Sequence, residues 1–382
     1  MREVIIVGGG PTGCLTASEL AKSFDVLVLE EHSEFGSPLQ CMGLVSNRVL
    51  GFVPSRKRGD LIEAAITRGK VTSPSGREFS VDFKEVKAYV IDRMKFDRIL
   101  AEEAMDRGVQ FELGSRVKAV RSSDKLEVGS KNGLRKADLL IGADGPHSLV
   151  RRTFFPASDI EFIRCYGAEI DSTIESEGEC AHVFLGGDVA PSFFAWTLPI
   201  KGGARIGLGA SGKKPYPYFK RLMKRLNGRI TRPIAGEIPI GLLPYFSMGN
   251  IGLVGDACCQ VKPISGGGLF TGLLGAKLCS QSVLEGDLES YRSRWMEAVG
   301  KEISGSLRLR GVYKKIRDKE IEELFSLLGR ESVKENLEDL ISELDLDYQF
   351  ISAGKIARST GFGGMASILR MGLRVLLRDE NE

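Results

Sequence analysis

Short apolar runs alternate with a helix-length segment in the first thirty residues of the chain. Residues 3–7 (EVIIV) and 25–29 (DVLVL) are rich in β-branched side chains, and residues 14–22 between them have the length of a helix. Strands that are apolar throughout and separated by a helix are typical of a βαβ unit in a parallel sheet. We therefore expect a parallel sheet to begin at the N-terminus.

The same pattern returns twice later in the sequence. Residues 137–145 and 251–256 are again apolar runs that end in acidic glycine turns, and residues 93–107 and 268–284 have helix length. Residues 64–90 and 160–245 differ, because alternating strands, aromatic residues, Gly and Pro favour an antiparallel sheet. Charged and apolar residues then recur at helical spacing to residue 345. The predicted fold is α/β: a Rossmann-like cofactor domain, an inserted antiparallel-sheet (α+β) substrate domain and a helical C-terminal region.

The predicted domain boundaries follow these changes of pattern. The cofactor domain is discontinuous and comprises residues 1–63, 91–157 and 246–287; the substrate domain comprises 64–90 and 158–245; the helical C-terminal region comprises 288–382. A chain of 382 residues can bury the cores of two such domains without disulfides or metals.

The composition of the chain argues against several classes of function. The 53 basic and 50 acidic residues are spread along the chain, which gives no basic face for a nucleic acid. The seven cysteines lack the paired spacing of a zinc site or a disulfide framework. Neither a signal peptide nor an apolar run of about 18 residues is present. We expect a cytoplasmic protein that has no metal and no nucleic-acid partner and does not span the membrane.

A glycine motif joins the first strand to the first helix. Gly8, Gly10 and Gly13 have the G-x-G-x-x-G spacing, and Glu30 ends the next strand about 20 residues on. The first glycine permits the tight turn, the second lets the backbone approach a pyrophosphate, and the third lets the helix pack on the sheet. The motif, which includes Thr12, therefore predicts a dinucleotide whose phosphates lie at the helix N-terminus. Glu30, with Glu31 as the alternative, is expected to bind the ribose hydroxyls.

A second G-x-G-x-x-G spacing runs from Gly207 to Gly212. Lys214 stands where a P-loop needs Ser or Thr for magnesium, and Pro215 and Pro217 obstruct a helix start. We interpret this segment as the end of a strand and a turn. The sequence therefore contains no second Rossmann site for a tightly held nicotinamide cofactor.

Asp256 lies at the end of the 251–256 strand, and a glycine run opens a helix about ten residues later. An aspartate at a strand end can accept hydrogen bonds from ribityl hydroxyls. The backbone amides near Gly268 and Leu269 can stabilise negative charge on a reduced flavin ring. Together with the N-terminal motif, this arrangement predicts FAD.

Six segments carry a resemblance that covers nearly the whole chain. They are GGGPTG (8–13), SPLQCMGLVS (37–46), IDRMKFDRIL (91–100), GADGPHSLVRR (142–152), FFAWTLP (193–199) and GDACCQVKPISGGG (255–268). The sequence resembles the FAD-dependent geranylgeranyl reductases, of the digeranylgeranylglycerophospholipid reductase type, within the fold group of p-hydroxybenzoate hydroxylase. The third, fourth and sixth segments also occur in the wider flavoprotein group, so they indicate FAD but not the substrate. The second and fifth segments indicate this family.

The resemblance implies positions for further cofactor contacts. Arg93 is expected over the ribityl-pyrophosphate region, the Val117 backbone at the adenine, and Cys41 and Met42 near the flavin ring. One departure affects the last pair, because family members often have Cys-Gly-Glu-Gly or Cys-Gly-Gly where this chain has Cys-Met-Gly-Leu at 41–44. Cys41 has three open interpretations: a proton donor, a flavin neighbour or a small buried apolar residue.

The fifth segment predicts the substrate wall. Alternate residues of a strand share a face, so Phe194, Trp196 and Leu198 would form an apolar surface suited to an isoprenoid chain. The alternative is simple core packing, and halogenases of the same fold group have a related tryptophan motif. His32, His147 and His182 are interpreted as structural.

The resemblance implies a function and its partners. The expected activity is saturation of carbon–carbon double bonds in geranylgeranyl groups, in archaeal-type ether lipid biosynthesis, with hydride from N5 of reduced FAD. The alternatives are a flavin-dependent monooxygenase or halogenase, or a non-catalytic lipid or electron carrier. The external electron donor is either ferredoxin or NAD(P)H.

A basic stripe near the C-terminus bears on localisation. Arg370, Arg374 and Arg378 lie on one side of a predicted helix at 365–378, opposite apolar residues. Such a helix either lies peripherally on the inner face of an anionic membrane or docks on its own protein.

Overall fold

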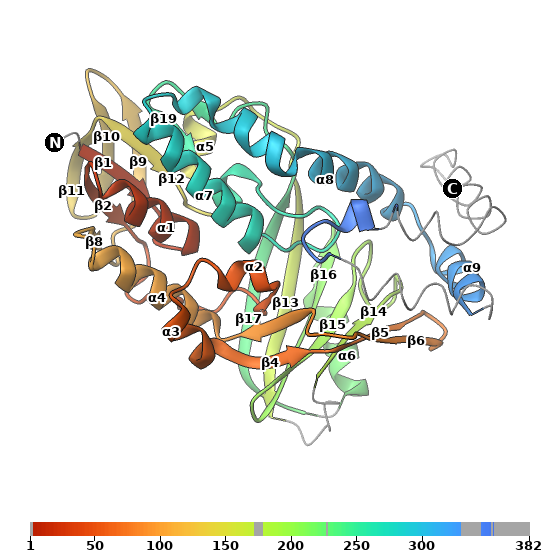
Figure 1. Ribbon diagram of the computed structural model, residues 1–382. Coiled ribbons are helices and arrows are strands. Elements are labelled where there is room, and N and C mark those ends of the chain that lie inside the picture. Colours follow the sequence, from red (N-terminus) through yellow and green to blue (C-terminus); the bar gives the residue numbers. More distant parts are fainter. Residues whose placement is uncertain (1–2, 172–178, 227, 330–344, 353, 355–382) are drawn as a thin grey trace.

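A six-stranded sheet forms one end of the molecule in the computed structural model, which describes residues 3–171, 179–226, 228–329, 345–352 and 354 (Figure 1). Its strand order is β18-β19-β12-β1-β2-β8. The strands are β1 (Glu3–Val7), β2 (Asp25–Leu29), β8 (Gln110–Glu112), β12 (Leu139–Gly142), β18 (Ser247–Met248) and β19 (Ile251–Leu253). All neighbours pair in parallel except β18 and β19. The predicted parallel sheet, assembled from distant parts of the chain, is confirmed.

Helices cover this sheet because its central strands are mostly apolar and must be buried. The helices of this part are α1 (Pro11–Leu20), α4 (Arg93–Met105), α5 (Leu149–Phe154), α7 (Leu269–Leu284) and α8 (Tyr291–Tyr313). Helix α1 packs against both α4 and α7. Trp295 of α8 is fully buried, and its indole N–H donates to the Thr271 carbonyl oxygen of α7 at 3.1 Å.

A three-stranded antiparallel sheet packs on the same core and was not expected from the sequence. It consists of β9 (Val117–Ser122), β10 (Leu126–Ser130) and β11 (Gly133–Ala137). Val120, Leu126 and Val128 join the core of the parallel sheet, whereas most of the other residues of β9 are exposed and those of β10 are only partly buried. The apolar positions are too few to stand out as strands in the sequence.

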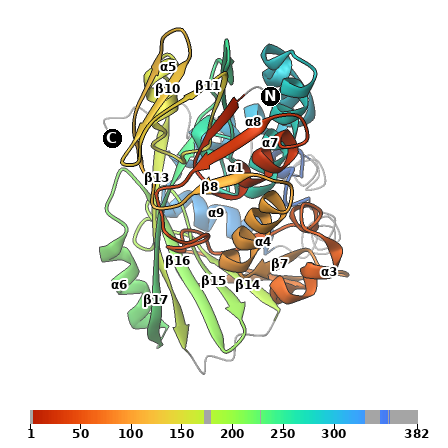
Figure 2. The same ribbon diagram turned by 90° about the vertical axis from the view of Figure 1, so that its left-hand side faces the viewer.

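The other half of the molecule contains a seven-stranded sheet with the order β17-β13-β16-β15-β14-β5-β6 (Figure 2). Its strands are β5 (Arg68–Thr72), β6 (Glu78–Asp82), β13 (Glu161–Asp171), β14 (Cys180–Phe184), β15 (Ala195–Ile200), β16 (Gly203–Ser211) and β17 (Arg229–Ile240). The expected antiparallel pairing needs one correction, because β14 and β5 pair in parallel. Strand β5 belongs to the earlier 64–90 excursion, so no hairpin sets its direction relative to β14.

Smaller elements link the two halves. Strands β3 (Leu44–Val45), β4 (Ile62–Ile66) and β7 (Ala88–Ile91) form a three-stranded sheet. The remaining helices are α2 (Asn47–Leu50), α3 (Ser55–Arg58), α6 (Tyr216–Arg225) and α9 (Asp318–Leu328), with 3-10 turns at Gly59–Leu61, Gly255–Cys258 and Leu288–Ser290. The 64–90 excursion is therefore divided between two sheets.

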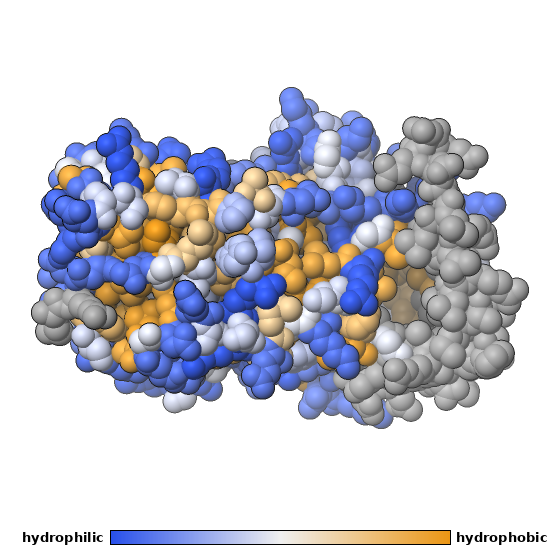
Figure 3. Space-filling model, turned by 90° about the horizontal axis from the view of Figure 1, so that it is seen from above, coloured by the Kyte–Doolittle hydropathy of each residue, from blue (hydrophilic) through white to orange (hydrophobic). Residues whose placement is uncertain are grey.

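Helices α8 and α9 agree with a helical C-terminal region (Figure 1). The basic stripe at Arg370, Arg374 and Arg378 lies outside the described residues. Within the described part of the chain, none of the helices combines the length and the apolar character that a membrane crossing requires. Seen from above, hydrophobic residues reach the surface between bands of hydrophilic ones (Figure 3).

Candidate functional site

A cavity of about 1460 Å³ lies between the parallel sheet and the seven-stranded sheet. Its volume exceeds the roughly 300–1,000 Å³ of pockets that hold one small ligand. The predicted site residues that line it are Gly8, Gly10, Thr12, Glu30, Cys41, Met42, Arg93, Val117, Phe194, Trp196, Leu198, Asp256, Gly268 and Leu269. Residues from eight separate stretches of sequence therefore meet at one place.

The three glycines of the first turn have different surroundings. A Cβ on Gly8 would lie 2.3 Å from the Ala143 carbonyl oxygen, and a Cβ on Gly13 would lie 2.0 Å from the Gly8 carbonyl oxygen. Gly13 does not line the cavity, whereas Gly10 lines it and has nothing within 4 Å of its Cβ position. Gly10 is also the N-cap of α1 and provides no side-chain cap, so the first amides of the helix are open to an anion.

Glu30 is buried directly behind this turn. Its Oε2 accepts a hydrogen bond from the Gly9 amide at 2.6 Å, and its Oε1 accepts one from the His32 amide at 2.8 Å. The His32 ring lies 2.7 Å from the same Oε1 through Nδ1, and His32 lines the cavity. His32 is therefore part of the site, which the sequence interpretation missed although it lies two residues from Glu30.

Arg93 and Asp97 form an ion pair on the cavity side of α4, with 3.0 Å between Nε and Oδ1. Burial raises the pKa of the Asp97 carboxyl, and the Arg93 guanidinium opposes that rise. Arg93 also interacts electrostatically with Cys41, so the arginine, the carboxylate and the thiol lie near one another along one wall. The i, i+4 spacing of Arg93 and Asp97 was a signal in the sequence for this pair.

Asp256 faces the cavity beside the start of α7. Burial raises its pKa to about 6, against the opposing charges of Arg93 and Arg151. The Cβ position of Gly268, the N-cap of α7, lies 3.2 Å from Asp256 Oδ1, and this helix also begins without a side-chain cap. A half-buried carboxylate and open helix amides thus lie side by side, as ribityl hydroxyls and a flavin ring edge require.

The loop that carries Cys41 lies directly on the seven-stranded sheet. Cβ atoms at Gly167 and Gly207 would lie 2.3 and 2.6 Å from the Met42 Cε atom, so only glycines leave room for this side chain. Gly207 belongs to β16, which pairs antiparallel on both sides. The interpretation of the second glycine motif as strand and turn is therefore confirmed, and Gly207 makes room for Met42.

The predicted apolar wall forms the neighbouring face of the cavity. Trp196 and Leu198 belong to β15, and Phe194 comes directly before that strand. The Phe194 and Trp196 ring centroids are 5.6 Å apart, edge to face. The Trp196 indole nitrogen is buried and has no hydrogen-bond partner in the described part of the chain.

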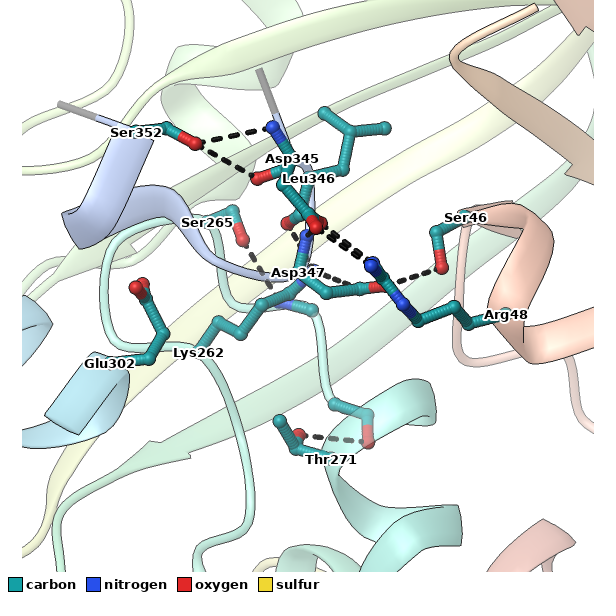
Figure 4. Close-up of polar contacts among 12 residues, drawn as sticks. Ser46, Arg48, Lys262, Ser265, Thr271, Glu302, Asp345, Leu346, Asp347 and Ser352 are labelled. Carbon is teal, nitrogen blue, oxygen red and sulfur yellow. Dashed lines mark hydrogen bonds and ion pairs between the residues drawn. The ribbon is translucent and has the colours of Figure 1, made fainter. Parts of the chain in front are cut away.

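Residues 345–352 close one side of the cavity, and nothing in the sequence predicted this. Leu346, Asp347 and Gln349 line it. The Lys262 ammonium donates to Asp347 Oδ1 at 3.0 Å and to the Leu346 carbonyl oxygen at 2.8 Å (Figure 4). The Ser46 hydroxyl donates to the other carboxylate oxygen of Asp347 at 2.5 Å.

The arrangement fits a dinucleotide with a flat ring system. Open amides at α1 and α7 face the cavity, and the carboxylates of Glu30 and Asp256 lie beside them to accept from sugar hydroxyls. Beyond Cys41 the walls become apolar at Trp196 and Leu198, which suits a hydrocarbon chain better than a polar substrate.

Comparisons with known proteins agree with this geometry. Residues 1–161 match the model of an FAD binding domain. Digeranylgeranylglycerophospholipid reductase of Methanothrix thermoacetophila is 30% identical over 87% of this chain and 92% of its own length. The enzyme of that name from Methanosarcina acetivorans is 28% identical over 84% and 87%.

One solved structure is similar over almost its full length. A geranylgeranyl bacteriochlorophyll reductase-like protein from Thermoplasma acidophilum superposes with a TM-score of 0.80 at 20% identity, covering 97% of this chain and 99% of that one. At that identity the likeness concerns the fold. FAD is the cofactor that the matching domain model names.

Proposed function

This chain belongs to the digeranylgeranylglycerophospholipid reductase family, and from that premise we propose that it saturates carbon–carbon double bonds of geranylgeranyl groups in an archaeal-type ether lipid, using FAD. The observation that carries the proposal is the single cavity. It runs from the glycine turn at Gly10 to the apolar wall at Trp196, so a dinucleotide and a hydrocarbon chain can share it.

Reduced FAD supplies the hydride when it is bound. The residues of the chain bind the cofactor and exclude water from the substrate. The amides at Gly10 and Gly268 and the carboxylates of Glu30 and Asp256 hold the cofactor, and Arg93 approaches its phosphate-sugar region. Phe194, Trp196 and Leu198 keep water away from the alkene. An isolated alkene has no activating carbonyl, so its reduction needs a proton at one carbon and a hydride at the other, in a dry site that fixes their positions.

We assign the proton to the Cys41 thiol or to a water beside it. Cys41 lines the cavity near Arg93, between the flavin-side and apolar walls. Cys165 also lines the cavity, but burial raises its pKa to about 12, which makes it a poor acid. Cys165→Ser is therefore the matched control for Cys41→Ser.

The proposal also assigns partners. Ferredoxin or NAD(P)H brings the electrons, and the lipid substrate brings the cytoplasmic chain to the inner face of the membrane. The strand character of Gly207 leaves the N-terminal motif as the dinucleotide site, which supports an electron donor that binds transiently.

The decisive experiment is anaerobic incubation of the dithionite-reduced protein with geranylgeranylated glycerol lipids, followed by mass spectrometry. We expect products that gain two hydrogen atoms per double bond, with slower turnover for Cys41→Ser than for Cys165→Ser. A reduced protein that leaves the lipid unchanged, or that incorporates oxygen when air and NAD(P)H are supplied, would refute the reductase.

A further inference from the structure

A basic surface surrounds α6, on the face of the seven-stranded sheet opposite the loop that carries Met42. Between Asp188 and Glu237 the sequence contains no Asp or Glu. The basic residues exposed on and beside α6 are Lys213, Lys214, Lys220, Arg221, Lys224, Arg225, Arg229 and Arg232, which we call the α6 basic surface. Figure 2 shows α6 on the outside of this sheet.

Most of these charges are uncompensated. Arg229 pairs with Asp171 at 3.2 Å and Arg232 with Glu169 at 3.6 Å. No ion pair engages the other six in the described residues, where Lys220 and Arg221 instead lie over the rings of Tyr216 and Tyr218. A surface with this excess of charge attracts polyanions.

Exposed apolar groups lie among the charges. Tyr216 is 50% exposed and Ile230 is 48% exposed. Phe219 and Leu222 are buried against the sheet, so α6 is fixed to the protein and turns only its basic side outward. Tyrosine and aliphatic groups embedded in a lysine-rich surface are typical of contact with the headgroup layer of a membrane.

This surface also adjoins the cavity. Pro215 and Tyr216, at the start of α6, lie on its wall. We propose that the α6 basic surface docks the protein on anionic lipid headgroups and so brings the cavity to a membrane-borne substrate. The docking itself is argued only from the charge and the exposure of these residues. The inference that docking brings the cavity to its substrate rests on the proposed function.

The other polyanion that the charge would suit is an acidic electron-carrier protein. The sheet argues against it, because α6 packs on Ala168 and Leu208, whereas Gly167 and Gly207 turn to the opposite face and contact Met42. A carrier docked on the outward side of α6 would be separated from most of the cavity by the thickness of the sheet, because only Pro215 and Tyr216 at the start of the helix reach the cavity wall. A membrane that docks on α6 does not transfer electrons, so it does not need to lie close to the cofactor.

Vesicle co-sedimentation of the FAD-loaded full chain tests the docking. We expect binding to vesicles of phosphatidylcholine mixed with phosphatidylglycerol, little binding to phosphatidylcholine alone, and release at about 1 M salt, where the screening length falls to about 3 Å. Replacing Lys213, Lys214, Lys220 and Lys224 by Gln is expected to weaken binding roughly 100-fold or more, since each basic residue near an anionic surface contributes about one kcal/mol.

The matched control removes four exposed charges elsewhere. Arg121, Lys125, Lys131 and Lys136 lie on or beside β9–β11, and their replacement by Gln should leave vesicle binding unchanged. The proposal is wrong if the wild-type chain ignores anionic vesicles or if both quadruple variants lose binding equally. It is also wrong if the α6 variant keeps vesicle binding but is no longer reduced by an acidic carrier. None of these outcomes depends on turnover, so failure of the reductase would be seen separately.

Discussion

The Arg205 guanidinium donates to the Met42 carbonyl oxygen at 2.9 Å, which ties the seven-stranded sheet to the loop that carries Cys41. The same nitrogen donates to the Ile91 carbonyl oxygen at 2.7 Å, and Glu169 balances the charge at 3.0 Å. Because Arg205 is only 3% exposed, these bonds have little competition from water. Arg205 thus positions Cys41 without lining the cavity.

Arg205→Met should unfold more easily by about 3–5 kcal/mol, because Glu169 loses its buried partner. Arg205→Lys should recover part of this loss, since lysine keeps the charge but its single ammonium cannot reach the two carbonyl oxygens and Glu169 together. A positioning role also predicts altered visible circular dichroism of the bound FAD in Arg205→Lys, at conditions where the variant is fully folded. An unchanged flavin spectrum in that variant would leave Arg205 with a purely structural role. Arg229→Met, at an exposed ion pair, is the control and should cost less than about 1 kcal/mol.

Gly10→Ala and Gly13→Ala separate cofactor binding from folding. The Cβ of Gly10→Ala would project into open space where the pyrophosphate is expected, so this variant should fold normally and bind FAD at least about tenfold more weakly. The Cβ of Gly13→Ala would overlap the Gly8 carbonyl oxygen, so this variant should lose stability without FAD present. Thermal unfolding of the FAD-free proteins and fluorescence titration with FAD measure the two effects. Equal FAD affinity of Gly10→Ala and wild type would contradict the assignment of the turn.

The cofactor half of the predicted site rests on local patterns in the sequence. A strand, a glycine turn and a helix that follow one another place Gly10 at an open helix N-terminus, and this position does not depend on contacts with distant segments. The same holds for Asp256, at a strand end that precedes a glycine-opened helix. Both residues line the cavity as expected.

The parts that sequence did not predict depend on contacts between distant segments. Asp347 reaches Lys262 and Ser46, and Arg205 reaches Ile91, across separations that no local pattern encodes. The sequence does not show that Asp347, Lys262 and Arg205 are buried, because a charged residue in the core looks the same in a sequence as one on the surface until its partner is known. The parallel pairing of β5 with β14 also joins distant segments, so no local pattern in the sequence predicts it.

Asp256 should make the FAD-free protein less stable as the pH rises. Its pKa of about 6 in the folded chain exceeds the ordinary value of 3.8, so the folded state binds this proton more tightly than the unfolded chain. The resulting stabilisation is complete below pH 4 and is lost as the pH rises through 6. FAD-free Asp256→Asn should therefore be more stable than wild type at pH 8, by at most roughly 3 kcal/mol, and equal to it near pH 4.

Denaturant unfolding at several pH values measures this difference, with the exposed Asp60→Asn as the control. Asp256→Asn should also bind FAD more weakly, since an amide is a poorer acceptor for sugar hydroxyls than a carboxylate. A variant that is less stable than wild type at pH 8 would mean that the Asp256 carboxylate has a stabilising partner in the protein.

The ion pair between Asp347 and Lys262 should fix residues 345–352 over the cavity. Asp347 is 1% exposed and Lys262 is 9% exposed, so Asp347→Ala leaves a buried ammonium uncompensated and should cost about 3–5 kcal/mol. Lys262→Met should cost less, because Ser46 and Arg48 still donate to Asp347. The double variant should therefore be more stable than the sum of the single losses predicts. Denaturant unfolding gives the coupling energy, and limited proteolysis reports whether the segment detaches. Additivity within about 0.5 kcal/mol would mean that the pair does not hold the segment, and that Phe350, which packs on Gly305, secures it instead.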